Sequence, residues 1–341
     1  AKALIIHADL LPNIADGIPE GCRVFVVETP PELQESYQVS PESALVPTDQ
    51  TGWYDWIKQF DPLETRDISS PGAMIYTSGT TGRPKCVRRK SGTPDEMDNL
   101  YETINQAFDI GPGKRTIIPA PLYHSAPNTY GILCVVMGMD EMVLMPRFDP
   151  EDLLRLIEKH KTTHLQTVPT MFIRMLKLPE EERAKYNVSS LEFVVHAAAP
   201  CPPDIKQQMI DWWGPIINEY YGATEVGAVS FLDSNQWLGH RGSVGEAMKN
   251  CEIVILDYDG RRLPANEIGD VYCRNMGGPD FTYHLDDEKR NNAEAEGLIS
   301  VGDIGYLDKD GFLYLCDRRN DMVISGGVNI YPAEIEACLI S

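Results

Sequence analysis

The chain has 341 residues, of which 43% are hydrophobic and 24% are charged, and its formal net charge is −21. This composition is typical of a soluble globular protein with two domains or several subdomains. So acidic a surface repels phosphodiester backbones, which argues against nucleic acid as a partner. No apolar run approaches the length that spans a bilayer, and the opening residues AKALIIHADLL lack the cleavage site of a signal peptide.

The eight cysteines are widely dispersed and form no C-x-x-C pair. Most of them lie inside apolar runs, which predicts reduced side chains in the core of a cytoplasmic protein. Neither a disulfide framework nor a cysteine metal site is expected. The oligomeric state is left open, a homodimer included.

The first 241 residues alternate between apolar strand patterns and amphipathic helix patterns. Strands are expected at 3–7, 23–28, 115–120, 164–168 and 191–196. Helices are expected at 53–60, around 97–108, after the capping pair Asp149-Pro150, and from Pro169 and Pro203. This alternation, with crossovers of this length, predicts an α/β fold with largely parallel sheets flanked by helices.

Helix patterns give way from about Gly242 to short strands joined by Asp-Gly turns. Residues 242–317 are predicted to form a β-rich, barrel-like subdomain without helices. Residues 318–341 are predicted to begin a small α+β domain, with a strand at 322–325 and a helix at 332–340. Together with the α/β part at 1–241, three parts are expected.

The densest chemical signal is TSGTTGRPK, which has four hydroxyls, two glycines and one lysine in nine residues. Glycine lets the backbone turn its N–H groups toward a ligand, and hydroxyls and lysine add donors and positive charge. The pattern predicts a phosphate-binding loop between two strands, without the spacing of a Walker A loop. An exposed turn is the alternative. The residues expected to bind phosphate are Thr77, Ser78, Gly79, Thr80, Thr81, Gly82 and Lys85.

These nine residues resemble the signature of the AMP-forming family of acyl-CoA synthetases, luciferases and adenylation domains. NEYYGATEVG further along the chain resembles the Y-G-x-T-E motif of this family. The resemblance implies that Tyr221 stacks on adenine beside Gly222, and that Thr224 and Glu225 are catalytic. It also implies that Glu225 is a ligand of Mg²⁺, for which a carboxylate oxygen is suited. Without the first motif, this segment would be an ordinary turn with a solvated carboxylate.

Two more segments resemble nucleotide-binding parts of the family. VGDIGYLDKDGFLYLCDR resembles the pattern that binds the ribose of AMP, which implies that Asp303 and Arg318 contact the ribose hydroxyls. HAAAPCP resembles the second face of the adenine slot, here Ala198 and Ala199. Tight helix–strand packing is the competing explanation for these alanines.

PLYHSAP places His124 at the family position that gates the acyl tunnel, although a lone histidine is more often structural. RRNDMVISGGVNIYPAEIE resembles the family hinge and the start of its C-terminal domain. The hinge position is Asn320, where the family commonly has Asp or Lys, and Gly327 lies where the pantetheine arm of CoA threads. The family pattern also has an opening portion and a late lysine that this chain lacks, so a fragment, incomplete at both ends, is expected.

These motifs together predict an ATP-dependent, AMP-forming carboxylic acid–CoA ligase that uses Mg²⁺, adenylates a hydrophobic acid and transfers the acyl group to CoA. One alternative is an adenylation domain that loads a carrier protein. Such domains pair an aspartate with the substrate ammonium group, and residues 119–138 contain no acid. The other alternative is a catalytically incomplete nucleotide-binding fragment. The identity of the acid is left open.

Overall fold

The computed structural model describes residues 2–62, 74–77, 85–319, 321, 323–325, 328–330, 332 and 339. The chain divides into two compact units, Ala1–Ser70 and Pro71–Ser341, each with its own sheets. Among the described residues, no helix has both the length and the apolar character needed to cross a membrane.

The first unit combines a small parallel sheet with short helices. Its elements are β1 Ala3–His7, η1 Ala8–Leu10, α1 Leu11–Ile14, η2 Ala15–Gly17, β2 Arg23–Val27, α2 Pro31–Tyr37, α3 Pro41–Ala44, β3 Thr51–Gly52 and α4 Trp53–Ile57. The strands pair in the order β1-β2-β3, and the ring of Phe25 packs against those of Trp53 and Trp56. The strand predicted at 3–7 is confirmed. The helix predicted at 53–60 is shorter, because residues 58–60 form a turn.

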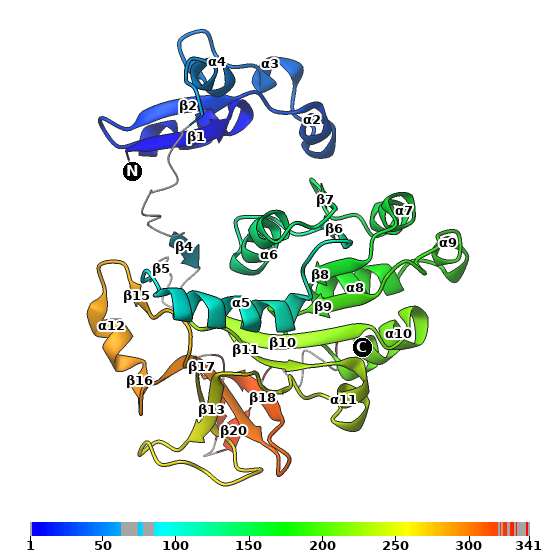
Figure 1. Cartoon of the computed structure of the whole chain (residues 1–341), viewed down its shortest axis with the longest axis vertical. Helices are drawn as coiled ribbons and strands as arrows, with labels where there is room; N and C mark the ends of the chain where they lie inside the picture. The colour runs from blue at the N-terminus through cyan, green and yellow to red at the C-terminus, as the bar shows by residue number, and fades with distance from the viewer. Residues whose placement is uncertain are drawn as a thin grey trace. The chain divides into compact units, whose positions relative to one another are not determined.

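The second unit is built on a seven-stranded sheet whose larger part is parallel (Figure 1). Its strands, in spatial order, are β12 Glu246–Ala247, β11 Gly227–Leu232, β10 Ile217–Ala223, β9 Phe193–His196, β8 His164–Thr167, β6 Arg115–Ile118 and β7 Glu141–Leu144. Neighbouring strands from β10 to β7 are parallel, whereas β11 pairs antiparallel with β10 and β12. The largely parallel sheet predicted from the strand–helix alternation is confirmed.

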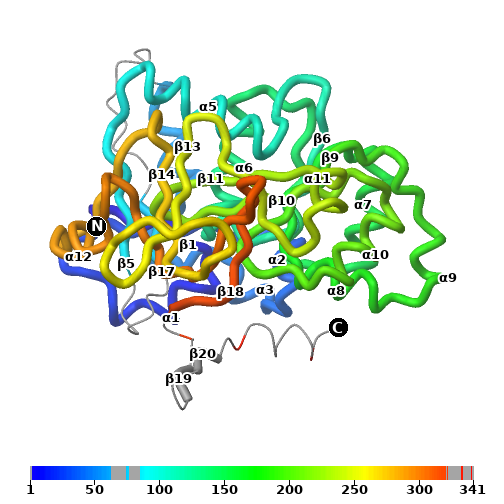
Figure 2. The backbone as a smooth tube through the Cα atoms, turned by 90° about the horizontal axis from the view of Figure 1, so that it is seen from below, coloured from blue at the N-terminus to red at the C-terminus, as the bar shows by residue number. Residues whose placement is uncertain are grey.

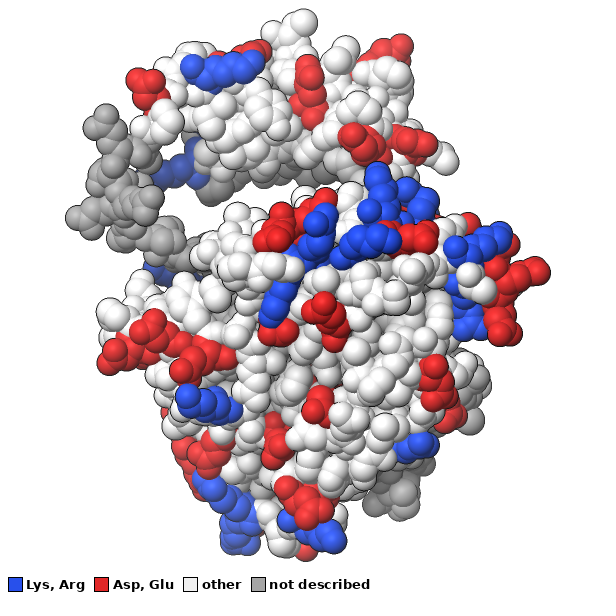
Figure 3. Space-filling view, turned by 45° about the vertical axis from the view of Figure 1, so that its right-hand side comes forward, with Lys and Arg blue, Asp and Glu red and all other residues white. Residues whose placement is uncertain are grey.

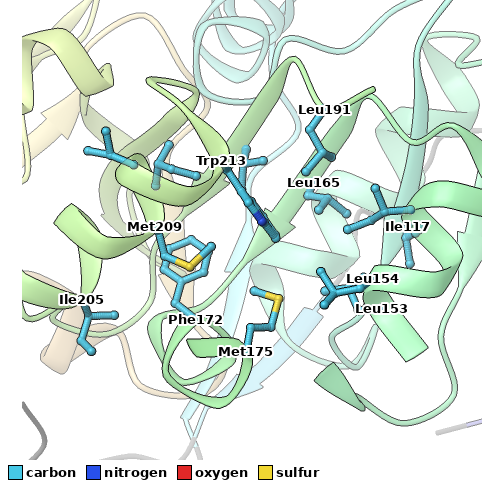
Figure 4. Packing of buried hydrophobic residues seen from close by; sticks show 14 of the residues in the cluster. Ile117, Leu153, Leu154, Leu165, Phe172, Met175, Leu191, Ile205, Met209 and Trp213 are labelled. Atoms are coloured by element: carbon cyan, nitrogen blue, oxygen red, sulfur yellow. The ribbon is translucent and has the colours of Figure 1, made fainter. Parts of the chain in front are cut away.

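Helices cover both faces of this sheet. They are α5 Pro94–Phe108, α6 Ser125–Val136, α7 Pro150–His160, α8 Pro169–Leu176, α9 Glu180–Arg183, α10 Pro203–Trp213 and α11 Ser234–Gly239. Ile117 and Val194 pack in one hydrophobic cluster with residues of α7, α8 and α10 (Figure 4). The next residue of each strand, Ile118 or Val195, packs with α5 and α6 instead. This alternation is what a sheet buried on both faces requires.

Helix ends follow local signals where these are strong. Asp149 accepts hydrogen bonds from the backbone N–H groups of Glu151 and Asp152 at the start of α7, and Gly214 ends α10 with a φ of 88°. Both ends confirm the prediction. The sequence does not indicate α6, because its residues are apolar around most of the helix and include a proline and a glycine.

The β-rich section contains an antiparallel sheet in the order β13-β14-β17-β16, with β18 also pairing with β17. Figure 2 labels β13, β14, β17 and β18 along the backbone. Its strands are β13 Cys251–Leu256, β14 Gly269–Asn275, β17 Leu298–Leu307, β16 Glu294–Ala295 and β18 Leu313–Arg318. The prediction that this section lacks helices is wrong. Helix α12, Asp287–Asn292, begins after Asp286, whose side chain accepts a hydrogen bond from the Lys289 N–H. The helix is too short to show a helical periodicity among the surrounding strand patterns. The proposed boundaries of this subdomain stay a prediction.

A small antiparallel sheet in the order β15-β5-β4 carries residues of the candidate site. Its strands are β4 Met74–Thr77, β5 Lys85–Arg89 and β15 Phe281–Tyr283. Near the C-terminus, β19 Val323–Ser325 pairs antiparallel with β20 Val328–Ile330. The helix predicted at 332–340 falls largely outside the described residues.

Charged side chains are interspersed on the surface. Arg262 pairs with Glu252 and Glu296, and Lys249 pairs with Glu102. On the face drawn in Figure 3, acidic and basic residues of the second unit stand beside one another. Exposed pairs of this kind contribute little to stability.

Candidate active site

Strands β4 and β5 carry the two ends of the predicted phosphate-binding loop. They pair antiparallel, with Thr77 opposite Lys85, so this loop joins two strands as the sequence predicts. The remaining residues of the predicted loop, Ser78, Gly79, Thr80, Thr81 and Gly82, lie outside the described residues.

Lys85 is half-buried at the start of β5. Its ammonium group lies 5.9 Å from the centre of the Tyr283 ring, and the ammonium group of Lys289 lies 5.7 Å from the same ring. Burial and the neighbouring Lys289 charge lower the pKa of Lys85, while the Glu225 carboxylate opposes this shift. Positive charge is therefore concentrated beside the predicted phosphate site, within an acidic protein.

The turn between β10 and β11 holds Thr224 and Glu225, the two predicted catalytic residues, and three other elements contact it. At the start of α6, the Ser125 hydroxyl lies 3.0 Å from the Thr224 hydroxyl. From β5, Arg89 Nη2 donates to the Thr224 carbonyl oxygen at 3.0 Å. From β15, the Tyr283 hydroxyl donates to Glu225 Oε1 at 2.9 Å. Contacts from three elements hold this turn in one geometry, as a preorganised site requires.

Asp303 and Arg318, predicted to bind ribose, lie directly opposite each other on β17 and β18. Arg318 Nε is 3.5 Å from Asp303 Oδ1, and the Tyr221 hydroxyl donates to Asp303 Oδ2 at 2.6 Å. Asp303 is thus held between a buried phenol and an exposed guanidinium group. Tyr221 itself is 8% exposed and packs in a hydrophobic cluster, so its stacking on adenine stays a prediction.

The segment after β9 contains the predicted second face of the adenine slot. Ala198 and Ala199 are exposed, and Ala198 has a φ of 74°, a conformation that non-glycine residues rarely adopt. Backbone strain of this kind clusters at binding sites and active sites. The binding of adenine by these alanines stays a prediction, which their exposure permits.

A buried ion pair joins α10 to β10 beside this segment. Lys206 Nζ lies 2.7 Å from Glu219 Oε2, and both side chains are almost fully buried. His196 Nε2 lies 3.4 Å from the same oxygen without hydrogen-bond geometry. Burial and the Lys206 charge hold the pKa of His196 well below its usual value, so the imidazole is neutral. Burial also raises the pKa of the Glu219 carboxyl.

His124 immediately precedes α6 and is exposed, with its ring 4.5 Å from the ring of Tyr123. It lies next in sequence to Ser125, which contacts Thr224. Its role as a gate for the acyl group stays a prediction. Asn320 and Gly327, the predicted hinge and pantetheine positions, lie outside the described residues.

Glu225 fits the predicted role of a magnesium ligand. Its side chain is half-buried, and the Tyr283 hydroxyl donates a hydrogen bond to one of its carboxylate oxygens. This bond fixes the orientation of the carboxylate. Mg²⁺ in nucleotide sites is held through one or two carboxylates together with phosphate oxygens. Glu225 would supply the carboxylate of this donor set, and the nucleotide would supply the phosphate oxygens.

His240, Asp308 and Asp310 also place ligand atoms within 4.8 Å of one another. However, His240 Nδ1 is hydrogen-bonded to Asp308 Oδ2 at 3.1 Å, and Asp308 Oδ1 accepts the N–H groups of Asp310 and Phe312. These hydrogen bonds stabilise the turn before β18, and they explain why the three side chains lie close together.

Sequence reasoning misses Ser125, Arg89 and Tyr283 as contacts of the Thr224–Glu225 turn. A signal exists for Arg89, because strand alternation places it on the same face of β5 as Lys85. No local signal exists for Tyr283, since β15 reaches β5 across nearly two hundred residues of sequence.

Comparisons with known proteins identify the family of the chain. The family of AMP-binding enzymes matches residues 1–278. A 2-succinylbenzoate–CoA ligase of Bacillus pumilus is 33% identical over 282 residues, which cover 81% of this chain and 54% of that protein. A long-chain-fatty-acid–CoA ligase of Bacillus subtilis is 31% identical over 292 residues, which cover 83% of this chain and 49% of that protein.

Among solved structures, o-succinylbenzoate coenzyme A synthetase of Bacillus subtilis, in complex with ATP and a magnesium ion, is similar with a TM-score of 0.71 and 26% identity. The similarity covers 99% of this chain and 74% of that one. The chain spans about half the length of the curated relatives it matches. Because the family match extends over most of its residues, the chain belongs to the family of AMP-binding enzymes.

Proposed function

We propose that the chain is the nucleotide-binding part of an AMP-forming acid–CoA ligase. The observation that carries this proposal is the arrangement of β10 and its turn. Tyr221 on this strand contacts the predicted ribose ligand Asp303, and Glu225 in the turn accepts from Tyr283 of β15, which pairs with β5 at one end of the predicted phosphate loop. Strand β10 and its turn therefore connect the proposed ribose-binding residues with the proposed magnesium ligand. Relatives named as acid–CoA ligases support the proposal.

In this proposal, the Asp303 carboxylate accepts from the ribose hydroxyls and Arg318 donates to them. Lys85, with the hydroxyls and amides of the preceding loop, binds the β- and γ-phosphates. The substrate carboxylate attacks the α-phosphorus, and the bond to pyrophosphate breaks. Mg²⁺, when bound at Glu225, neutralises charge on the leaving pyrophosphate.

The residues around Glu225 do the positioning. Tyr283 orients the Glu225 carboxylate, and the Ser125 hydroxyl at the start of α6 contacts the Thr224 hydroxyl in the turn. In a second step the CoA sulfur attacks the acyl carbon, the bond between the acyl group and AMP breaks, and AMP leaves. Gly327 is a proposed contact of the pantetheine arm of CoA, and Asn320 is the proposed hinge.

The proposed substrate is a carboxylic acid with a hydrophobic body, aryl or aliphatic. Ala198 and Ala199 leave space beside the proposed adenine slot, and residues 119–138 offer no carboxylate to a substrate ammonium group. The relatives' names include one aryl acid and one class of fatty acid. An acid of either class is compatible with these features.

The test uses the full-length protein that carries this chain. We expect release of pyrophosphate that depends on a hydrophobic acid, followed by thioester formation when CoA is added. Glu225→Gln should slow adenylation by about a hundredfold or more, while AMP affinity stays unchanged because AMP lacks the metal-bridged phosphates. Glu267→Gln, an exposed carboxylate before β14, is the matched control. The proposal is wrong if no acid in a broad panel stimulates pyrophosphate release.

A further inference from the structure

Arg89 on β5 contacts the backbone of the turn that carries Thr224 and Glu225. Its Nη2 donates to the Thr224 carbonyl oxygen at 3.0 Å. The same atom would lie 3.5 Å from a Cβ built on Gly227, where β11 begins. The guanidinium group therefore bonds to the Thr224 end of the turn and lies near the Gly227 end, with Glu225 between these two residues in sequence.

The strand of Arg89 is also the strand of the predicted phosphate loop. Side chains alternate along β5, so Arg89, Val87 and Lys85 share one face. Tyr283 lies opposite Val87 and shares this face, because directly opposed residues of an antiparallel pair project together. One face of the small sheet thus provides Lys85 to the phosphates, Tyr283 to Glu225 and Arg89 to Thr224.

The chemistry of Arg89 suits a structural tie. A guanidinium group stays charged and offers five donors in a fixed plane, so it can satisfy a carbonyl oxygen in a tight turn. Burial lowers the pKa of Arg89, and the nearby Glu225 carboxylate raises it. Arg89 lines a small cavity together with Glu225 and Arg274, which places a second guanidinium group close by without a contact to Thr224.

We propose that Arg89 is a positioning residue that ties the Glu225 turn to the strand of Lys85, so that Mg²⁺ and the nucleotide phosphates bind as one unit. This inference rests on the proposed function. Arg89 does not contact the substrate in this scheme and acts through the Thr224 carbonyl oxygen. Its loss leaves the ribose pair of Asp303 and Arg318 in place, since that pair is held by β17, β18 and Tyr221.

The experiment measures ATP affinity by calorimetry in Mg²⁺ and in EDTA, together with AMP affinity, for the full-length protein. The wild type is expected to bind ATP more tightly with Mg²⁺. In Arg89→Gln this gain should fall about tenfold, the effect of losing one charge-assisted hydrogen bond, while AMP affinity stays within about twofold.

Arg274→Gln is the matched control, because it removes a guanidinium group from the same cavity but leaves the Thr224 contact intact. It should keep the full gain from Mg²⁺. Arg89→Lys keeps the charge and the apolar stem, and it serves if the glutamine variant does not fold. It should lose part of the gain, since a lysine lacks the planar fork.

The inference is overturned if Arg89→Gln keeps the full gain, if Arg274→Gln loses as much, or if Arg89→Gln weakens ATP and AMP binding equally. The last result would show a structural role alone. Failure of the proposed function is distinguishable, because the wild type itself would then bind ATP in neither buffer.

Discussion

Gly222 is required by the close approach of β10 and β11 rather than by an unusual φ. A Cβ at this position would lie 1.9 Å from the Gly227 carbonyl oxygen and 2.8 Å from the Cα atom of Ala228. The strand register shifts between Tyr221 and Gly222, which marks a bulge. Because of the bulge and the lack of a side chain at Gly222, Tyr221 on β10 can contact Asp303 while Glu225, in the turn that follows, contacts Tyr283.

Gly222→Ala should therefore destabilise the second unit by about 3 kcal/mol, because the atom it meets is backbone that cannot swing away. The free energy of unfolding in urea is the measurement. Gly239→Ala is the control, since a Cβ at the end of α11 meets nothing within 4 Å and should change stability by about 1 kcal/mol or less. Equal effects of the two substitutions would contradict the steric argument.

Residues within recognisable motifs could be predicted from the sequence, and residues brought in by long-range pairing could not. Asp303 and Arg318 are predicted because their segment resembles a family motif, and both lie in one hairpin, where they stand opposite each other. Tyr283 reaches Glu225 only because β15 pairs with β5. Such a pairing follows from the complete fold and leaves no periodic trace in the local sequence.

At the scale of elements, the sequence predicts α7 and α10 because each combines one apolar face with a capping signal. It does not predict α6, because apolar residues lie on most sides of this helix. It does not predict α12 either, because this helix has only six residues and its one local signal is the aspartate that caps it. Periodicity identifies an element by the contrast between its faces. Where both faces are alike or the helix is short, that contrast is missing.

The contact between α10 and β10 includes one buried ion pair in addition to its hydrophobic packing. Lys206 is fully buried, its ammonium group lies 2.7 Å from Glu219 Oε2, and it also lies 5.2 Å from the ring of Trp237. Because β10 continues into Tyr221 and Gly222, this pair supports the strand that carries the candidate site. Removal of one partner would leave the other charge buried without compensation.

Lys206→Met should therefore cost about 3 to 5 kcal/mol of stability at neutral pH, and Glu219→Leu should cost a similar amount. The double variant should recover most of this loss, because two apolar side chains replace two buried charges. Urea unfolding of the four proteins provides the double-mutant cycle. Additive losses would show that the two charges do not compensate each other.

At the scale of the whole molecule, the two units differ in the size of their cores. Among residues 2–62, the part of the first unit that the structure describes, few large apolar side chains are buried, chiefly Phe25 and Val26 of β2. Several others remain exposed, including Leu45 at 60%, Tyr54 at 59% and Phe60 at 59%. The second unit contains the large hydrophobic cluster between the seven-stranded sheet and helices α7, α8 and α10. A three-stranded parallel sheet with little buried area is marginal by itself.

A fragment of residues 1–70 should therefore fail to unfold cooperatively, whereas a fragment of residues 71–341 should show a single sigmoidal transition. Below about 70 to 80 residues, one hydrophobic core rarely outweighs the entropy lost on folding. Far-ultraviolet circular dichroism in a urea series measures both fragments. Tryptophan fluorescence gives a second probe, since Trp53 and Trp56 lie in the first unit and Trp213 and Trp237 in the second. If the short fragment shows a steep transition by both probes, its core is sufficient, and the exposed side chains of the first unit do not limit its stability.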